Sequence, residues 1–414
     1  MKQQSRHILR SLRHRNYQLF FAGQLISLIG TWMQSLAMSW LVYRMTNSPF
    51  ALGVIGFSSQ ISAFFVTPFA GVWADHANRR KLVILTQTLA MVQALALAVL
   101  VFLGAARVWH IVFLSVFLGL VNSFDMPVRQ SFTVDMIEDK EDLGNAIALN
   151  SMIFNSARFI GPPIAGAVVA LWGEGICFLL NGISYIAVII ALMMMHIPHL
   201  THRTRPDSVL KSMREGFVYT INHKPIRSII LLMGMVSLVV FPYAILMPVF
   251  ARDVLHGTSQ TLGFLLGAIG VGAFGGATYM ASREGIGGIG KRLAAATAAM
   301  GSGIIILSFV RSLGASLAIL LLVGFGMMVT MASCNTFLQT VVEDKMRGRV
   351  MGFYVMAFVG LTPFGSLFAG WLASRIGTPY TIMIAGILCV CAALVFSVRL
   401  GQFERFVNQH LTGA

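Results

Sequence analysis

Charged residues are scarce in this chain of 414 residues, since Asp, Glu, Lys and Arg together make up 11% of it. A soluble globular domain carries roughly twice that share. Hydrophobic residues make up 57%, which is the composition of a protein whose core lies in lipid. The sequence therefore excludes an ordinary soluble protein and indicates an all-α membrane protein.

Cysteine is also rare, and nucleotide-binding motifs are missing. The four cysteines, Cys177, Cys334, Cys389 and Cys391, lie inside apolar runs without metal-ligand spacing to a histidine. The glycine-rich run 263–276 has no lysine at Walker spacing, and no nucleophile and base share a pocket context. We therefore expect no disulfide scaffold, no metal, no cofactor and no enzymatic activity.

Acidic residues are half as frequent as basic ones, 15 against 30, which gives a net charge of +15. An excess of bases often indicates nucleic-acid binding. Here the bases are scattered through short segments between apolar runs, which is typical of residues that set membrane topology. We expect no nucleic-acid partner.

Long hydrophobic runs dominate the chain. Twelve of them are long enough to cross a bilayer, over residues 17–43, 49–72, 82–104, 109–131, 144–171, 175–196, 226–250, 260–282, 291–311, 314–337, 348–374 and 379–400. An even number places both termini on one side, and the loops of that side hold most of the lysines and arginines. Both termini are therefore predicted to be cytoplasmic, in a multi-pass protein of the cell (inner) membrane. The first run is too long for the core of a cleavable signal peptide.

The longest connection divides the chain near its midpoint. The sequence predicts one six-helix bundle over 1–196, a cytoplasmic linker over 197–225, and a second six-helix bundle over 226–414. Within the linker, Ser208–Asn222 can form a short helix at the membrane surface. The two halves also resemble each other, because Glu-Asp-Lys occurs at 138–140 and again at 343–345, each before a predicted span.

The loop Gly71–Lys81, GVWADHANRRK, lies between the second and third runs. Asp75 can cap a helix or pair with Arg79 one turn further on, while Arg79 and Arg80 hold this end on the cytoplasmic side. The pattern Gly-x-x-x-Asp-x-x-x-Arg-Arg-Lys resembles the loop signature between the second and third helices of the major facilitator superfamily. Asn78 stands where the family usually has Gly. The alternative is a basic loop that only sets topology.

Further segments resemble the branch of this superfamily that holds the macrolide efflux proteins and the enterobactin exporter. They are Gly30–Gln34, Leu41–Thr46, Asp125–Arg129, Asn145–Asn150 and Arg158–Pro162. The resemblance implies the major facilitator fold, two pseudo-symmetric bundles of six transmembrane helices with a site between them at mid-depth. It also implies a secondary active transporter that exports its substrate by alternating access, in exchange for protons.

In this family the loop acid and first base form a latch that locks the cytoplasmic face, and an acid at the end of the fourth helix joins them in a charge relay. The resemblance assigns latch and relay to Gly71, Asp75, Arg79, Arg80, Asp125 and Arg129. Asp125 and Arg129 are one helical turn apart and can pair. The alternative is a static ion pair that anchors the helix end.

Polar residues recur at helical spacing in several spans. In the first span, Gln24, Ser27, Thr31 and Gln34 share one face, which must look at protein or water because lipid-facing polar groups are costly. Asn122 in the fourth span and Asn155 in the fifth add further polar side chains. We assign this set to a substrate cavity, with interhelical hydrogen bonding as the alternative. The seventh span has no such stripe.

Arg158 lies near the middle of the fifth span. An unpaired arginine there costs ~3 kcal/mol or more, so it faces a cavity or a partner. We assign it to the substrate cavity, with a purely structural arginine as the alternative. The following Gly161, Pro162 and Gly166 resemble the glycine- and proline-rich antiporter motif of drug exporters, which bends the helix, although Ala165 replaces one glycine of the motif.

The sequence thus predicts a transporter, a monomer in the lipid bilayer, that exports a small amphipathic molecule such as a drug, siderophore or metabolite in antiport with protons. Asp125 is the deepest acid and is predicted near a helix end, so the sequence shows no mid-membrane carboxylate of the kind that usually carries the proton. The alternatives are a uniporter or importer of a small metabolite and a non-transporting membrane sensor on the same fold. A sensor usually adds a soluble output domain, and neither tail is long enough for one.

Overall fold

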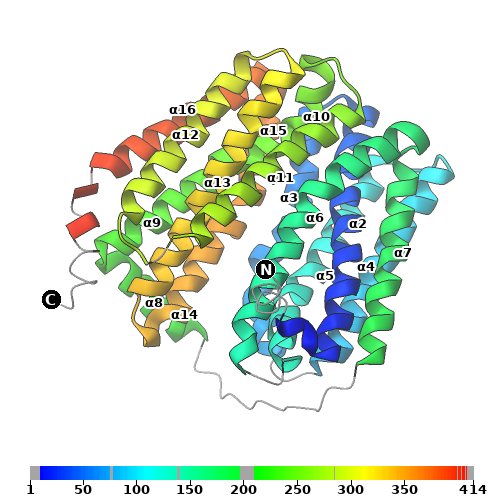
Figure 1. Ribbon diagram of the computed structural model, residues 1–414. Coiled ribbons are helices and arrows are strands. Elements are labelled where there is room, and N and C mark those ends of the chain that lie inside the picture. The colour runs from blue at the N-terminus through cyan, green and yellow to red at the C-terminus, as the bar shows by residue number, and fades with distance from the viewer. Residues whose placement is uncertain are drawn as a thin grey trace, which may run out of the picture. The chain divides into compact units, whose positions relative to one another are not determined.

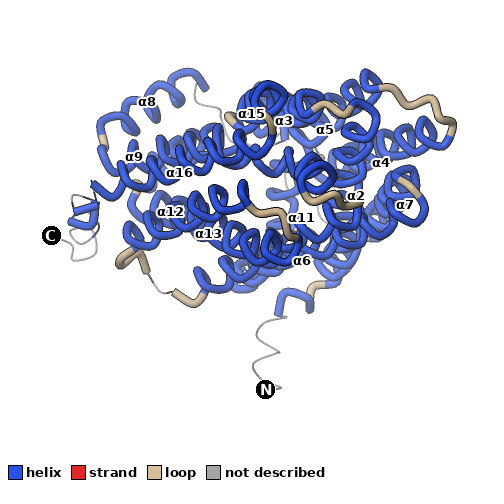
Figure 2. Tube along the Cα trace, turned by 90° about the horizontal axis from the view of Figure 1, so that it is seen from above, coloured by secondary structure: helices blue, strands red, loops and turns tan. Residues whose placement is uncertain are grey.

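The computed structural model describes residues 10–74, 78–137, 140–195, 209–283, 285–398, 400–401, 403–405 and 407. Within these residues the regular elements are all helices, as the blue tube of Figure 2 shows. This agrees with the composition, because every backbone hydrogen bond of a helix is made inside the segment and none needs water.

The first half of the chain forms six long helices (Figure 1). They are α2 (Arg15–Thr46), α3 (Pro49–Ala74), α4 (Arg79–Phe102), α5 (Val108–Asp135), α6 (Leu143–Trp172) and α7 (Glu174–Met194). Two 3-10 turns, η1 (Arg10–Arg13) and η2 (Lys140–Asp142), precede α2 and α6.

The second half adds six more spans, two of which are composite. The seventh span, Lys224–Val254, consists of α9 (Lys224–Met235), η3 (Val236–Val240), η4 (Phe241–Leu246), α10 (Met247–Val249) and η5 (Phe250–Val254). The eleventh consists of α14 (Asp344–Val355), η6 (Met356–Gly360) and α15 (Thr362–Ile376). The other four are α11 (Ser259–Ala281), α12 (Ile289–Phe309), α13 (Leu313–Val341) and α16 (Thr378–Val398).

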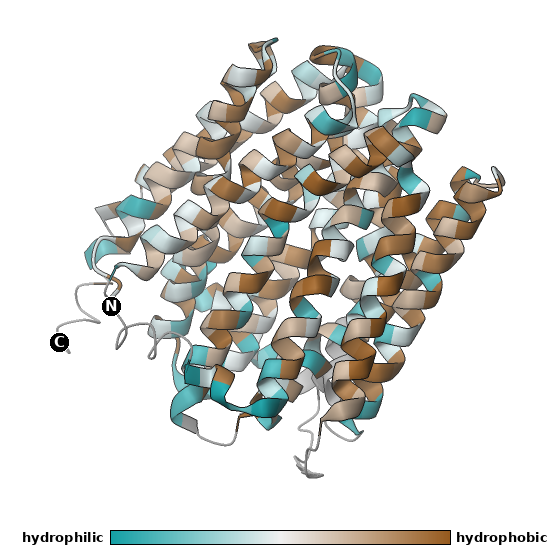
Figure 3. Cartoon of the chain, turned by 45° about the vertical axis from the view of Figure 1, so that its right-hand side comes forward, coloured by the Kyte–Doolittle hydropathy of each residue, from teal (hydrophilic) through white to brown (hydrophobic). Residues whose placement is uncertain are grey.

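The predicted fold class is confirmed. The described part of the chain contains 12 helices that are long and apolar enough to cross a membrane, and their bounds differ from the predicted runs by a few residues. Hydrophobic residues predominate along the middle of these helices and hydrophilic ones gather towards their ends (Figure 3). The largest differences are longer ends, such as α5, which continues to Asp135.

The chain divides into two compact units, which we call the first and the second unit. The first comprises Met1–Met45, Ser58–Arg205 and Thr258–Gly263, and the second comprises Thr46–Phe57, Pro206–Gly257 and Phe264–Ala414. The start of α3 therefore belongs with the second unit and the start of α11 with the first. The predicted boundaries at 196 and 226 do not include these two exchanged segments.

A helix, α8 (Val209–Asn222), lies in the connection where a short amphipathic helix was predicted. It packs along α14, and the two lie side by side in Figure 1. Glu215 pairs with Arg349, and Phe217 contacts Phe353 with ring centroids 5.9 Å apart. Burial raises the pKa of Tyr219, as does nearby Glu343. The position of α8 at the membrane surface stays a prediction.

Aromatic and aliphatic side chains form the core at one end of the first unit. The buried cluster there includes Tyr17, Phe20, Val128 and Phe132. Tyr17 is fully buried, and its hydroxyl donates a hydrogen bond of 2.8 Å to the carbonyl of Ala146 on α6. Burying a tyrosine is favourable when its hydroxyl finds such a partner, so this bond fixes α2 against α6.

Polar contacts tie the start of the chain to the start of α6. The backbone N–H of Ser11 donates to Asn145 Oδ1 at 2.9 Å, and its hydroxyl donates to the Asp142 carbonyl at 2.8 Å. The Asp142 carboxylate also pairs with Arg10 and lies 3.0 Å from His14, measured from Oδ2 to Nε2. The Ser11 N–H is one of the backbone donors that a helix leaves free at its N-terminus, and Asn145 supplies its acceptor.

Two spans of the second unit depart from α-helical geometry where they meet. η3 and η6 are π-helical segments, and Ser237 of η3 donates its hydroxyl to the carbonyl of Phe358 in η6. Thr362 donates to the same carbonyl at 2.8 Å and lies 2.8 Å from the Ser237 hydroxyl. A π-helical turn leaves carbonyls without their usual helical partner, and these hydroxyl groups satisfy one of them.

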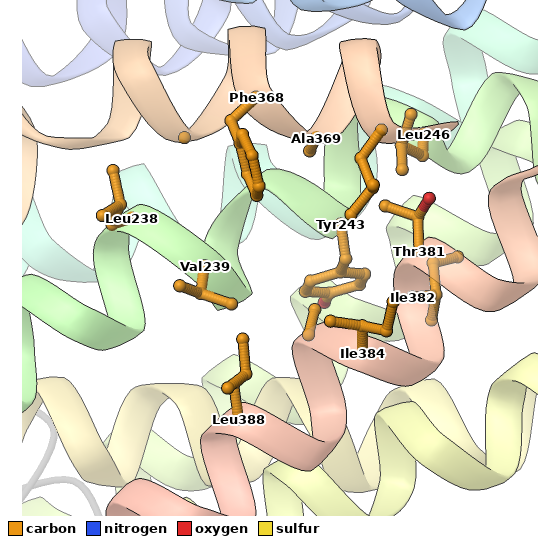
Figure 4. A pocket seen from close by; sticks show the side chains of 13 residues that line it. Leu238, Val239, Tyr243, Leu246, Phe368, Ala369, Thr381, Ile382, Ile384 and Leu388 are labelled. Carbon is orange, nitrogen blue, oxygen red and sulfur yellow. The ribbon is translucent and has the colours of Figure 1, made fainter. Parts of the chain in front are cut away.

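A small apolar pocket lies beside these segments (Figure 4). Its volume is about 30 Å³, and its wall includes Val239, Tyr243, Phe368 and Ile382 from three spans. Ligand sites for drug-sized molecules measure ~300 Å³ or more. This pocket is therefore a packing feature.

Candidate functional site

Asp125 is a buried carboxylate inside the first unit, with 4% of its surface exposed. Its Oδ1 accepts hydrogen bonds from Thr86 Oγ1 at 2.6 Å and Gln87 Nε2 at 2.9 Å, both on α4. Its Oδ2 lies 3.3 Å from Nε of Arg129, one turn further along α5. A buried charge is tolerated when it is paired and hydrogen-bonded, and Asp125 meets both conditions.

Arg129 links this ion pair to a third helix. Its Nη1 donates to Gln24 Oε1 on α2 at 2.8 Å. Gln24 is buried, and its Nε2 has no hydrogen-bond partner among the described residues. Leaving a buried donor unsatisfied costs about 1–3 kcal/mol. The arrangement therefore leaves one amide donor available for a water molecule or for a rearranged neighbour.

The helix that carries Asp125 is longer than predicted. The sequence ended this span at residue 131, which would place Asp125 near the helix end. α5 instead continues through Pro127 to Asp135, so about 15 Å of helix follows Asp125 at 1.5 Å per residue. The 28 residues of α5 measure ~42 Å, which is longer than a ~30 Å hydrocarbon layer. Asp125 therefore lies between the middle of α5 and its end.

Arg79 has an acidic partner that the sequence did not predict. Arg79 Nη1 donates to both carboxylate oxygens of Asp135, at 2.9 and 3.0 Å. The resemblance had assigned Asp125 as the acid that joins Arg79 in a relay. Asp125 lies ten residues earlier on the same helix and faces Arg129, so the helix end brings Asp135 to Arg79 instead. Asp75, the other predicted latch residue, lies outside the described residues.

The neighbouring base has a different role. Arg80 donates from Nε to the carbonyl of Leu192 at 2.8 Å and from Nη2 to the carbonyl of Met193 at 2.7 Å. These carbonyls belong to the last turn of α7, which has no intrahelical donors for them, and a cation there also complements the helix dipole. Arg80 thus holds α4 to α7. Gly71 lies near the end of α3.

A chain of amides joins three helices deeper in the unit. Gln34 Nε2 on α2 donates to Gln93 Oε1 on α4 at 2.9 Å, and Asn181 Nδ2 on α7 donates to Gln34 Oε1 at 2.8 Å. All three residues are buried. Tyr185, also on α7, forms side-chain hydrogen bonds with Thr31 and Asn181. On the polar face predicted for the first span, Gln34 therefore points into the protein and holds α4 and α7 by hydrogen bonds, whereas Thr31 is exposed.

Arg158 lies at the middle of α6, fifteen residues after Leu143 and fourteen before Trp172. Its side chain is partly exposed, and its guanidinium carbon lies 5.7 Å from the centroid of the Trp32 ring on α2. A guanidinium over a tryptophan face gains ~0.5–2 kcal/mol, more as water is excluded. Asn155, one turn earlier, donates to the carbonyl of Ser151 on its own helix at 2.8 Å.

The glycine and proline positions of α6 mark close helix crossings. A Cβ placed on Gly161 would come within 2.6 Å of Trp32 Cβ, so α6 and α2 touch at this glycine. Pro162 is buried next to it. One turn further, a Cβ on Gly166 would come within 2.6 Å of the Ser259 carbonyl at the start of α11. These positions therefore act in packing, and Arg158 is held beside Trp32 by the first of them.

The comparisons with known proteins now decide the family. A family model described as "Transmembrane secretion effector" matches residues 8–411, which is almost the whole chain. The chain belongs to the major facilitator superfamily. It is a transporter and not an enzyme, and it is a multi-pass membrane protein.

Curated relatives cover almost the full length. The staphyloferrin A transporter of Staphylococcus aureus is 25% identical over 91% of this chain and 94% of its own length. Macrolide efflux protein A of Streptococcus pyogenes is 21% identical, over 92% and 96%. The multidrug efflux pump Tap of Mycobacterium tuberculosis is 23% identical, over 92% of both. The predicted resemblance to macrolide efflux proteins is thereby confirmed.

Solved structures support the fold. A bacterial homologue of the human lysosomal transporter Spinster, in an inward-facing and unoccupied conformation, aligns with a TM-score of 0.70 at 14% identity, over 96% of this chain and 98% of its own. A bacterial homologue of the iron transporter ferroportin aligns with a TM-score of 0.68 at 16% identity, over 94% and 98%. At these identities the likeness concerns the fold alone.

Within this transporter, the predicted cavity residues fall into two groups. Gln24, Ser27 and Gln34 are buried, and both glutamines hold neighbouring helices by hydrogen bonds. The accessible group has exposed or partly exposed side chains and consists of Thr31, Asn122, Asn155 and Arg158. The described residues contain no group of His, Cys, Asp and Glu that could hold a metal ion.

Sequence reasoning missed several partners of these residues. Asp135, Gln93, Asn181 and Trp32 each contact a predicted site residue. Helical spacing contained part of the signal for Gln93, since Thr86, Ala90 and Gln93 are three and four residues apart and all buried. Asp135 was missed because it was placed in a loop. No sequence pattern pointed to Trp32 as the aromatic partner of Arg158.

Proposed function

We propose that this protein is a secondary active transporter that exports a small amphipathic molecule, such as a drug, siderophore or metabolite, by alternating access in exchange for protons. The observation that carries the proposal is Arg158. A partly exposed cation at the middle of a spanning helix, beside an aromatic face, offers a charge and an apolar surface to the same ligand.

The surroundings of Arg158 fit an amphipathic ligand. Trp32 and Phe154 contact each other edge to face, with ring centroids 6.0 Å apart, and Phe154 and Met152 are exposed on the same helix as Arg158. Ligand sites are mostly apolar, with a few polar groups that fix orientation. Asn155 and Thr31 supply neutral polar groups near this surface, so a molecule with one anionic or hydrogen-bonding end matches it.

The names of the relatives support the direction of transport. Two of them are described as efflux proteins and one as a transporter of staphyloferrin A. On that basis we propose that this chain also exports its substrate, with protons as the exchanged ion. We further propose that it acts as a monomer in the inner membrane, with both termini in the cytoplasm. A uniporter or importer of a small metabolite is the other outcome of the experiment below.

The test uses everted membrane vesicles that contain the full-length protein. A compound panel that includes ethidium, a macrolide and a carboxylate-rich siderophore is followed for uptake, with and without an ionophore that collapses the proton gradient. We expect the vesicles to accumulate one class of compound, and to lose this accumulation when the proton gradient is collapsed or when the protein carries Arg158→Ala. Uptake that survives collapse of the proton gradient would indicate a uniporter instead of an antiporter. Uptake found only in right-side-out vesicles would indicate an importer instead of an exporter.

A further inference from the structure

We propose that the exposed face of α8 (Val209–Asn222) binds the surface of a bilayer that contains anionic phospholipid. Two arginines flank two apolar side chains on this face. The ligand is the phosphate-bearing headgroup of the lipid together with the adjoining part of its acyl chains. The inference concerns how the protein is held in its membrane, and it does not depend on the proposed export.

One face of α8 is closely packed on α14. A Cβ on Gly216 would come within 2.9 Å of the Arg349 side chain and 3.1 Å of the Phe353 ring. Thr220, which follows Gly216 by four residues and so shares its face, is buried. Glu215 beside them pairs with Arg349. This face is therefore occupied by protein, and a ligand has access to the opposite face.

The opposite face has a stripe of exposed side chains. Arg214, Val218 and Ile221 follow one another at steps of four and three residues, so they lie on one side of the helix. Val218 is 48% exposed and Ile221 40%, and Phe217 at the margin of the stripe is 52% exposed. Apolar side chains next to a cation are typical of a helix that lies at the boundary between headgroups and acyl chains.

The chain connection places this stripe at the level of the headgroups. α8 ends at Asn222, and the seventh span begins at Lys224. His223 joins the two helices, and its Nδ1 lies 2.8 Å from the carbonyl oxygen of Tyr219. α8 lies at the edge of the second unit beside α9 (Figure 2). A linker of one residue keeps the end of α8 where the seventh span enters the bilayer.

The contact with α14 keeps the rest of α8 at the same level. α14 begins the eleventh span, which has 33 residues. That span measures ~50 Å, which exceeds the ~30 Å hydrocarbon layer, so its first turns pass through the headgroups. Glu215 and Phe217 contact Arg349 and Phe353 within these turns. The exposed stripe therefore lies beside lipid along its whole length.

The charge of this segment favours anionic lipid. Residues 209–227 contain one acid and four bases, and the bases are Lys211, Arg214, Lys224 and Arg227. The acid, Glu215, is paired with Arg349 on the packed face. Arg227 Nη1 lies 3.4 Å from the carbonyl oxygen of Ile221, which places a second guanidinium at the end of the stripe. Bases at a membrane surface bind anionic lipids in preference to neutral ones.

A lipid satisfies both parts of the stripe. A guanidinium binds a phosphate through two parallel hydrogen bonds, and exposed apolar side chains gain free energy when acyl chains cover them. A free phosphate ion would occupy Arg214 and leave Val218 and Ile221 in water. The stripe as a whole therefore matches a phospholipid in a bilayer.

Quenching by brominated lipids measures this binding. Asn222 is exposed at the end of α8, so Asn222→Cys is labelled with bimane in an otherwise cysteine-free, full-length protein. The protein is reconstituted in vesicles of phosphatidylcholine and phosphatidylglycerol, with bromine on the acyl chains of one lipid or the other. Because bromine quenches bimane at short range, titration of the brominated lipid gives the binding constant of phosphatidylglycerol relative to phosphatidylcholine.

We expect a relative binding constant above one that falls about fivefold in Arg214→Gln, the factor for one cation at an anionic surface. The matched control is Lys291→Gln, which removes an exposed base at the start of α12 and should leave the constant unchanged. Added salt should lower the preference for phosphatidylglycerol, since exposed charges are screened. Val218→Ser should weaken quenching by both lipids to the same extent, because it changes the apolar part alone.

Four results would overturn the inference. The first is no quenching by either brominated lipid, which would place α8 away from the bilayer. The second is equal binding of the two lipids in the wild type, and the third is the same loss in Lys291→Gln as in Arg214→Gln. The fourth is a preference abolished by inorganic phosphate but kept in chloride of equal ionic strength, which would assign the stripe to a free anion.

Discussion

Arg79 of α4 and Asp135 of α5 form an ion pair with two hydrogen bonds at the end of the first unit, and both side chains are mostly buried, 16% and 12% exposed. The pair joins the base of the loop signature to an acid outside that signature. A fully formed pair of this kind stabilises one arrangement of α4 and α5, and removing one partner leaves a charge in a poorly hydrated place.

We expect Arg79→Ala and Asp135→Asn each to slow transport about tenfold, because the loss of ~1.4 kcal/mol from one conformation changes its population by that factor. The double variant should be no slower than either single variant, since the two residues share one interaction. Initial rates in everted vesicles, corrected for the amount of protein in the membrane, measure this. Asp344→Asn is the control, because its partner Arg347 is at the surface. Wild-type transport rates in both single variants would indicate that the bases of this loop only set the membrane topology.

Arg158 gives a sharper prediction. Arg158→Lys should reach the membrane and lose most transport activity, because an ammonium lacks the planar fork and stacks less well on Trp32. Arg158→Ala should lose nearly all activity. Arg311→Ala is the control, since Arg311 binds the carbonyls of Ser308 and Val310 at a helix end. Normal transport by Arg158→Ala, or failure of both variants to fold, would make the residue structural.

Gly30 tests the amide chain. A Cβ at this position would lie 2.6 Å from Asn181 Oδ1 and 2.8 Å from Ser184 Oγ, so Gly30→Ala must displace Asn181 from Gln34. We expect a loss of about 1–3 kcal/mol in stability. Gly144→Ala is the matched control in a helix, because no atom lies within 4 Å of its Cβ and alanine favours helix.

The midpoint of thermal unfolding measures this effect in detergent. A thiol-reactive dye reports unfolding when the buried thiols of Cys177, Cys334 and Cys389 become accessible. The exposed Cys391 reacts in the folded state and sets the baseline. Equal midpoints for the Gly30 and Gly144 variants would contradict the close crossing of α2 and α7.

Topology can be tested by labelling from outside the cell in a cysteine-free background. Ser48→Cys and Ser312→Cys should react with a membrane-impermeant maleimide, because they lie in the loops that contain few bases. Ser208→Cys should react only after the membrane is opened. External labelling at position 208 would show that the orientation is the reverse of the predicted one.

Hydropathy was sufficient to predict the twelve spans, because a lipid-embedded helix needs about 20 apolar residues whatever its neighbours are. It was less accurate at helix ends. α5 continues to Asp135 because the last polar residues have partners in the protein, such as Arg79 for Asp135. That extension leaves Asp125 ten residues before the end of α5, further from the end than predicted.

Helical spacing identified faces but not partners. It grouped Gln24 and Gln34 correctly on one buried face of α2, yet one glutamine meets Arg129 and the other meets Gln93 and Asn181. Which helices face each other depends on packing across the whole unit, and the residue spacing of a single helix does not determine its neighbours. Arg158 was found from its depth alone, whereas its contact with Trp32 depends on the crossing at Gly161.

The distorted seventh span has a consequence for any helical-wheel drawing of this protein. The π-helical η3 takes up more residues per turn than an α-helix, and the 3-10 segment η4 takes up fewer. The angular phase of the side chains therefore changes within Val236–Leu246, and a wheel drawn straight through misassigns the residues beyond it. Variants in this span are therefore best designed from contacts such as that between Ser237 and Phe358.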